Sequence, residues 1–272
     1  MKKNRALTGA MLAMLTLLSG CIQFVSVKDI AKDEPGYLAA NFGVDALPAS
    51  VRSRLPAAGA HPLPFRQLIA SGTLTGHTNT ARIDSDFKAT FINAGDTGLV
   101  QEVLEVSANG IPSNVSFNIS YLNIYELKAE TAAYAQSIAF IPFMVHGVDN
   151  DQFAFDVPKE DETYTTRFRI GTTVQIANFS SMVETCHAGH YYLASQINPA
   201  LTGKAIDLDC EETRDGIVQN KGLHTYLTEY GIALSRSFAT STAKLEWNYG
   251  EFEKDGQKTP TRLDKAVDDK SV

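Results

Sequence analysis

The densest group of side chains that could do chemistry lies in residues 184–190, which hold a carboxylate, a thiol and two imidazoles. His187 and His190 are three residues apart with Glu184 nearby, so together they could ligate zinc, which accepts imidazole and carboxylate in tetrahedral sites. The H-E-x-x-H arrangement of helical zinc sites is absent, because no glutamate follows His187 and the histidine spacing is three, not four. We therefore expect a polar loop here, with His187 and His190 as weak metal candidates and no cofactor.

Other catalytic patterns are missing or unspecific. The chain has no G-x-S-x-G serine motif and no phosphate-binding glycine loop, so neither that type of nucleophilic catalysis nor nucleotide binding has support. Aspartates two apart share one face of a strand and could hold a divalent cation or act as an acid and base couple. Three such pairs occur: Asp84 and Asp86, Asp149 and Asp151, Asp207 and Asp209. Surface turns favour aspartate as well, and this is the simpler explanation.

The start of the chain has the layout of an export signal. Its basic residues are Lys2, Lys3 and Arg5. Residues 6–18 are mainly apolar and too short to span a bilayer, which takes about 20 apolar residues. Residues 17–21 then read LLSGC. This run resembles the lipobox of bacterial lipoproteins, in which a branched apolar residue and two small residues precede a cysteine.

The lipobox resemblance implies a processed and acylated N-terminus. The Cys21 sulfur would receive a diacylglycerol, cleavage would fall between Gly20 and Cys21, and the new amino group would be acylated. Each buried acyl methylene contributes about 0.8 kcal/mol, so several chains make a stable membrane anchor. Ile22 and Gln23 follow Cys21, where an aspartate would favour retention in the inner membrane. The resemblance therefore implies an outer-membrane location, with the acyl chains as the contact with the membrane.

The remaining two cysteines fit an exported protein. With Cys21 committed to lipid, Cys186 and Cys210 form an even pair, and in an oxidising compartment such a pair is most simply a disulfide. A redox-active or metal-binding pair is the alternative, but the C-x-x-C spacing typical of one is absent. We expect a structural bridge between Cys186 and Cys210.

Composition and charge narrow the class of protein. Hydrophobic residues make up 44% of the 272 residues, which is enough for a sizeable core and excludes wholesale disorder. The chain has 24 basic and 31 acidic residues, a net charge of −7. Nucleic-acid binding needs clustered Lys and Arg, which this acidic chain does not show, so no nucleic-acid partner is expected.

Composition also suggests how the chain is divided. Residues 1–20 are the expected signal peptide, and residues 21–64, which contain five of the ten prolines, read as a lipidated start and a tether. Residues 65–250 are the expected globular domain. Half of residues 251–272 are charged, which predicts a frayed polar tail.

Apolar and polar residues alternate through much of residues 65–250, as in half-buried strands. The clearest segments are 115–121, 164–176, 226–238 and 245–249. We predict a mainly β fold, an antiparallel sandwich or curved sheet with a few short helices. An outer-membrane barrel is a weaker alternative, because the apolar faces are short for its lipid-facing band.

Three segments are less clear. Asn109-Gly110 is typical of a hairpin turn, yet residues 99–104 also carry apolar residues at helical spacing. Residues 126–137 are rich in alanine and look helical, and residues 138–148 are expected to form a buried strand.

The sequence thus predicts a location and a fold class more firmly than an activity. We expect a lipid-anchored cell-envelope protein whose domain is a non-catalytic binding or scaffolding module with a protein partner in the envelope. One alternative is an envelope hydrolase or metal-dependent enzyme that uses His187 and His190. Another is a carrier with a hydrophobic ligand cavity between the sheets.

Overall fold

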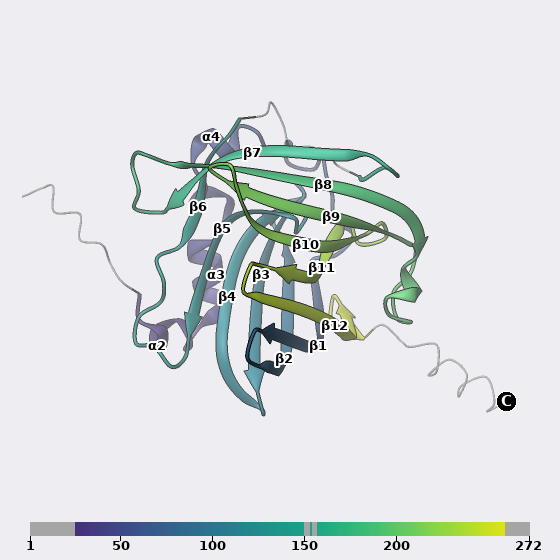
Figure 1. Cartoon of the computed structure of the whole chain (residues 1–272), viewed down its shortest axis with the longest axis horizontal. Coiled ribbons are helices and arrows are strands. Elements are labelled where there is room, and N and C mark those ends of the chain that lie inside the picture. The colour runs from purple at the N-terminus through teal and green to yellow at the C-terminus, as the bar shows by residue number, and fades with distance from the viewer. Residues whose placement is uncertain (1–24, 150–152, 154–156, 259–272) are drawn as a thin grey trace, which may run out of the picture.

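A closed antiparallel sheet forms the body of the protein (Figure 1). The computed structural model describes residues 25–149, 153 and 157–258. Each strand pairs with the next one along the chain, and β1 also pairs with β12, so the sheet closes into a barrel. The strands are β1 (Gln67–Thr78), β2 (Arg82–Asn93), β3 (Leu99–Ala108), β4 (Ile111–Tyr121), β5 (Tyr125–Ala133), β6 (Phe143–Val148), β7 (Thr163–Thr172), β8 (Ser180–Leu193), β9 (Lys204–Arg214), β10 (Ile217–Leu227), β11 (Ile232–Ala239), β12 (Ala243–Lys254) and the short β13 (Gln257–Lys258).

The prediction of a mainly β, antiparallel fold is confirmed, and the sheet curves until its edges meet instead of forming two packed layers. Strand β4 shows how the alternation is used. Its apolar residues, such as Val115 and Phe117, are fully buried on the outer face. Its polar residues, such as Ser116 and Asn118, point into the barrel and line its cavities. On β4 the alternation therefore marks an outer face that must be covered and an inner face that is polar.

Residues of the expected tether provide this cover. They form the helices α2 (Val27–Ile30), α3 (Glu34–Asn41), η2 (Val44–Ala46) and α4 (Ala49–Arg52). Phe42 is fully buried and stacks on Phe117 of β4 with ring centroids 5.9 Å apart. The Nζ of Lys128 donates to the carbonyl of Asn41 at 2.6 Å, which ties α3 to β5. Residues 26–52 therefore belong to the folded body, because their apolar side chains seal the outward apolar face of β3–β5.

Several local predictions change in the structure. The alanine-rich segment expected to be a helix is mostly strand β5, because pairing with β4 overrides a weak helical preference. Asn109 and Gly110 have φ of 53° and 74° and form the β3–β4 hairpin, so residues 99–104 are strand and not helix. The expected strand over residues 226–238 is split into β10 and β11 by a turn at Gly231, whose φ is 68°.

The two ends of the barrel differ. At one end, which we call the hairpin end, lie the connections β1–β2, β3–β4, β5–β6, β7–β8, β9–β10 and β11–β12, as up-and-down pairing requires. At the opposite end Tyr121, Tyr125 and Phe153 stack on one another, with Tyr121 and Phe153 centroids 4.5 Å apart. Phe168 of β7 joins this group at 5.9 Å from Tyr125. Aromatic packing therefore fills the end away from the hairpins.

Some predicted features lie near or beyond the ends of the described residues. Strands β12 and β13 take residues 251–258 of the expected tail into the sheet, whereas residues 259–272 lie outside the described residues. The signal and lipobox over residues 1–21, and Asp151, lie outside them as well. Among the described helices, none has the length and apolar character needed to cross a membrane. The outer face of the barrel carries ion pairs such as Lys88–Glu105 and Lys221–Glu211.

Candidate binding site in the barrel lumen

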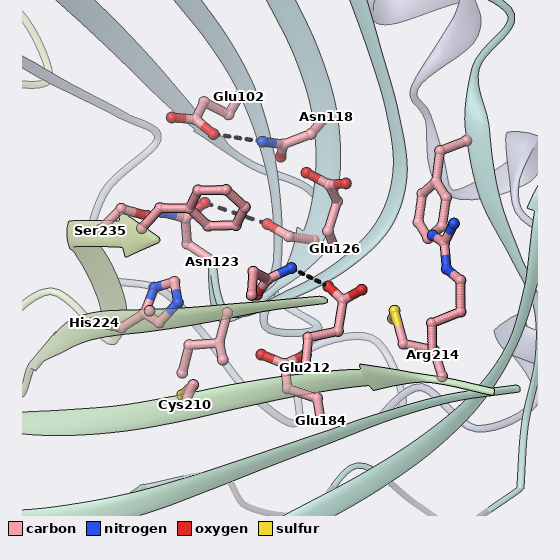
Figure 2. A pocket seen from close by; sticks show the side chains of 17 residues that line it. Glu102, Asn118, Asn123, Glu126, Glu184, Cys210, Glu212, Arg214, His224 and Ser235 are labelled. Atoms are coloured by element: carbon pink, nitrogen blue, oxygen red, sulfur yellow. Dashed lines mark hydrogen bonds between the residues drawn. The ribbon is translucent and has the colours of Figure 1, made fainter. Parts of the chain in front are cut away.

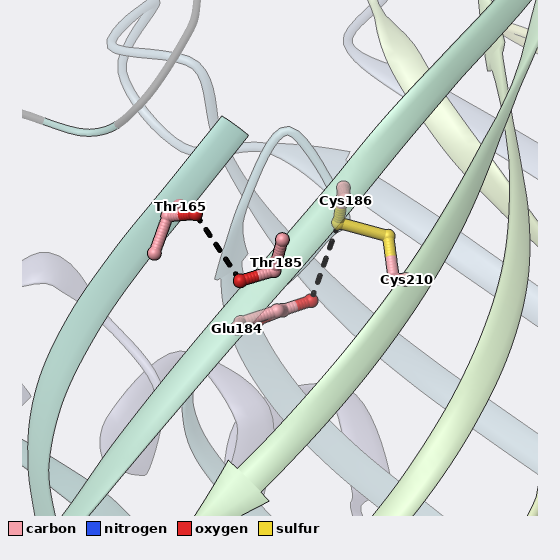
Figure 3. The surroundings of a disulfide bond; sticks show 5 residues. All are labelled: Thr165, Glu184, Thr185, Cys186 and Cys210. Atoms are coloured by element: carbon pink, nitrogen blue, oxygen red, sulfur yellow. Dashed lines mark hydrogen bonds between the residues drawn. A yellow bond between two sulfur atoms is a disulfide. The ribbon is translucent and has the colours of Figure 1, made fainter. Parts of the chain in front are cut away.

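The predicted disulfide between Cys186 and Cys210 is present (Figure 3). The two residues face each other on the neighbouring strands β8 and β9, and both are buried inside the barrel. Since directly opposed residues share a face of the sheet, both sulfur atoms point inward. The Cys186 sulfur lies 4.0 Å from a carboxylate oxygen of Glu184. The bridge thus forms part of the wall of the lumen.

The histidine pair is placed on the outside of the same strand. His187 is exposed and its Nδ1 lies 3.2 Å from the hydroxyl of Thr163, while His190 is exposed and lies 3.8 Å from Asp161. Among the described residues, the only cluster with metal-ligand spacing is Glu184 with Cys186 and Cys210. The disulfide consumes both sulfurs of that cluster, so it is not a metal site. The structure brings no third ligand to His187 and His190 within the described part of the chain.

The lumen gathers four carboxyl groups, of which the sequence pattern marks only Glu184, and that one beside His187 and His190. Glu102, Glu126, Glu184 and Glu212 come from β3, β5, β8 and β9, and all four line one cavity (Figure 2). The cavity has a volume of about 520 Å³. Residues of different strands can meet in this way only because the barrel closes, so the acidic cluster is a product of the tertiary structure.

Hydrogen bonds orient two of the four carboxylates. The Asn118 amide donates to Glu102, and the Asn220 amide donates to Glu212 at 3.0 Å. Across the described residues, no ion pair joins any of the four to a lysine or arginine. One cation, Arg214, lines the cavity where β9 ends. The lumen is therefore acidic overall, and no lysine or arginine of the described ranges forms an ion pair with its carboxylates.

Enclosure in the lumen raises the pKa of three of the four carboxyl groups. Loss of hydration raises the pKa of Glu102 to about 7, and the hydrogen bond from Asn118 opposes that rise. Loss of hydration and repulsion from Glu102 and Glu212 raise the pKa of Glu126 to about 7. Loss of hydration and repulsion from Glu212 and Glu126 raise the pKa of Glu184 to about 8. Near neutral pH the cluster is thus partly protonated, and a bound positive charge would favour its ionised form.

Polar atoms beside the carboxyls lack partners. The Nδ1 of His224, the Oδ1 of Asn118 and the Nε of Arg214 are buried without a hydrogen-bond partner. Burial also lowers the pKa of His224 to about 4, so this imidazole is neutral at physiological pH. Buried polar groups are nearly always paired in proteins, and unpaired ones need an explanation. All three residues line the cavity, so a ligand in the lumen would supply the missing partners.

A second, smaller cavity adjoins the first. It has a volume of about 310 Å³ and shares Glu102, Asn118 and Glu126 with the larger one. Its other walls include Trp247 and Tyr249 of β12. Burial raises the pKa of the Tyr249 phenol, so its ring stays neutral. The lumen therefore combines an acidic centre with an aromatic wall, and Trp247 is the single tryptophan of the chain.

The sequence carried only a faint signal for this site. Glu184 shares its strand face with Met182 and Cys186, so its inward direction follows from the alternation. Glu102 lies in a segment whose pattern fits both a strand and a helix, and Glu126 lies in an alanine-rich segment whose pattern predicts a helix, so the sequence does not indicate that either side chain points into a lumen. The meeting of the four glutamates depends on the register of distant strands, which no local pattern reports.

Comparisons with protein-family models, with curated proteins and with solved structures found no match for this chain.

Proposed function

We propose that this chain is a lipid-anchored, non-catalytic binding protein of the bacterial outer membrane, and that its barrel lumen binds a small organic cation. One observation supports the ligand class above all others. Four glutamates converge on a single cavity without a lysine or arginine partner among the described residues. Carboxylates that have lost hydration and have no cationic partner are costly, and a cationic ligand offsets that cost.

The rest of the lining fits the same ligand. The unpartnered Oδ1 of Asn118 is an acceptor for an ammonium N–H, and the faces of Trp247 and Tyr249 can stabilise a cation. An apolar ligand, the alternative considered from the sequence, would leave the glutamates without partners. Arg214 at the cavity edge would face an acceptor group of the ligand.

Calorimetry with a matched pair of probes tests the ligand class. Full-length acylated protein in detergent is titrated with diaminobutane and with butanediol, which has the same length and no charge. We expect the diamine to bind and its affinity to rise from about pH 6 to about pH 8, because the carboxyls of Glu102, Glu126 and Glu184 ionise in that range. Trp247 fluorescence gives an independent reading, since its ring lines the lumen.

Two substitutions on β9 test whether the carboxylates of the lumen are what binds the diamine. Glu212→Gln removes a charge from the lumen, whereas Glu211→Gln changes the adjacent residue, which lies on the outer face and pairs with Lys221 at 3.0 Å. We expect about a tenfold loss of diamine affinity in Glu212→Gln and no change in Glu211→Gln. Equal binding of diol and diamine, or equal affinity in the two variants, would refute the proposed ligand class.

The anchor is tested in living cells. We expect Cys21→Ser to abolish incorporation of labelled fatty acid and to leave the precursor uncleaved, because serine oxygen does not replace the alkylated thiol. In the unsubstituted protein the label should follow the outer-membrane fraction. Fatty-acid label retained in Cys21→Ser, or a wild-type chain found in the cytosol with its first residues intact, would contradict the anchor.

A further inference from the structure

Exposed apolar side chains are concentrated at the hairpin end of the barrel. Of the eleven large exposed hydrophobic residues in the described chain, all but Val157 and Leu193 lie there. They sit on several different connections and strand ends, and the main ones are Ile83, Ile111, Ile138, Phe140, Ile176 and Ile217. Ile176 is 93% exposed and Ile111 is 70% exposed. Single exposed apolar residues are common, but such a bias toward one end marks a contact surface.

The N-terminal end of the described chain lies at this same end. Ser26 forms a β-bridge with Ile138 of the β5–β6 connection, and the amide of Ala139 donates to the carbonyl of Val25 at 3.0 Å. Figure 1 shows α2, which follows directly, beside this connection at the lower left. Cys21 precedes Val25 by four residues, and an extended chain covers at most about 3.6 Å per residue. The Cys21 backbone is therefore held within roughly 14 Å of Val25.

We infer that the hairpin end rests on the lipid bilayer, with its exposed aliphatic and aromatic side chains in the interfacial layer. This inference rests on the proposed acylation of Cys21. Acyl chains that enter the membrane so close to Val25 bring the β5–β6 connection to the surface, and the other hairpins of that end follow because the barrel is one sheet. Burial of apolar area in the interface then adds to the anchor.

The charges at the hairpin end agree with an apolar contact. Arg82 pairs with Asp84 at 3.1 Å, and Lys244 pairs with Glu246 at 2.6 Å, so these charges compensate one another. These pairs leave no excess of positive charge that would favour anionic lipid. The surface therefore suits a zwitterionic lipid such as phosphatidylcholine.

The contact would also orient the binding cavity. The lumen lining includes Phe143, Arg214 and Phe238, which stand at or next to the strand ends of the hairpin end. The aromatic group of Tyr121, Tyr125 and its neighbours fills the other end. In this arrangement the part of the cavity that Phe143, Arg214 and Phe238 line is turned toward the lipid headgroups.

Site-specific fluorescence tests this arrangement on the acylated full-length protein. Cysteine is introduced at Ile111, Ile176 or Ile217, and at Leu193 as a control, which is 60% exposed at the opposite end. Since lipid occupies Cys21 and the disulfide occupies the other two, the new thiol is the single labelling site. Each labelled protein is reconstituted in phosphatidylcholine vesicles and quenched with iodide in the water or with a spin-labelled lipid.

We expect lipid quenching and protection from iodide for the labels at the three hairpin-end positions, and the reverse at Leu193. Hairpin-end labels as open to iodide as the Leu193 label, in protein whose acylation is verified by mass, would overturn the membrane contact and leave the anchor intact. Protein without acylation would instead refute the proposed anchor. Protection that depends on protein concentration in detergent alone would assign the surface to a second copy of the chain.

Discussion

The free energy of unfolding should fall by about 3 kcal/mol between about pH 5 and pH 8, measured by urea denaturation without ligand. Glu102 and Glu184 have raised pKa values of about 7 and about 8 in the folded barrel, above the usual carboxyl value of 4.5. Between the unfolded and folded pKa values the folded state binds more protons, so its stability declines as the pH rises. Glu126 adds less, because its side chain is exposed to the cavity.

The pKa of His224 shifts in the opposite direction, which changes how the free energy of unfolding is expected to depend on pH. Burial lowers the pKa of His224 to about 4, below the usual histidine value of 6.5. Between these two values the unfolded chain binds the extra proton, so the contribution of His224 to the free energy of unfolding rises with pH. Above about pH 6.5 only the carboxyl effect remains, and the decline should be steepest there. Glu126 and Glu212 are the charged groups that act on Glu184, and Arg214 lines the same cavity.

A single substitution identifies the source of the decline. Glu184→Gln should be more stable than the parent protein by about 1 to 2 kcal/mol at about pH 8 and nearly equal to it at about pH 4.5. Glu211→Gln, on the outer face, should leave the profile unchanged. A stability that is flat or increasing above pH 6.5 would show that the lumen carboxyls are hydrated as in water.

Removal of the disulfide should cost about 3 kcal/mol of unfolding free energy. The bridge closes a loop with a sequence separation of 24, which includes the β8–β9 connection and η3 (Ala194–Gln196). Loop closure lowers the entropy of the unfolded chain by an amount of that order. The double variant Cys186→Ala with Cys210→Ala should therefore denature at a lower urea concentration than the oxidised parent.

A chemical control distinguishes the effect of the disulfide bond from the effect of replacing the cysteine side chains. Parent protein that is unfolded, reduced and refolded in the presence of reductant should match the double variant in stability. Both sulfurs are buried, so reduction without unfolding should be slow. Equal midpoints for the oxidised parent and the double variant would mean that pairing of β8 with β9 alone closes this part of the barrel.

Alternation of apolar and polar residues predicted where strands form, but it did not predict what each face of a strand contacts. The alternation in residues 115–121 predicts a strand with one packed and one hydrated side, and β4 has both. The wet side, however, lies inside the barrel and the packed side lies under α3. In residues 126–137 the alanine spacing favours a helix, but most of this segment forms strand β5 because it pairs with β4. Local preference is weak compared with the hydrogen bonds and packing that two neighbouring strands provide.

The amino-acid sequence by itself determined the mainly β class and the pairing of Cys186 with Cys210, because side-chain alternation and cysteine number are local or countable properties. Tertiary structure alone decided the closure of β1 on β12, the cover by residues 26–52 and the meeting of four glutamates in one lumen. These features depend on the register and curvature of strands far apart in the chain. That information arises only when the whole sheet has formed.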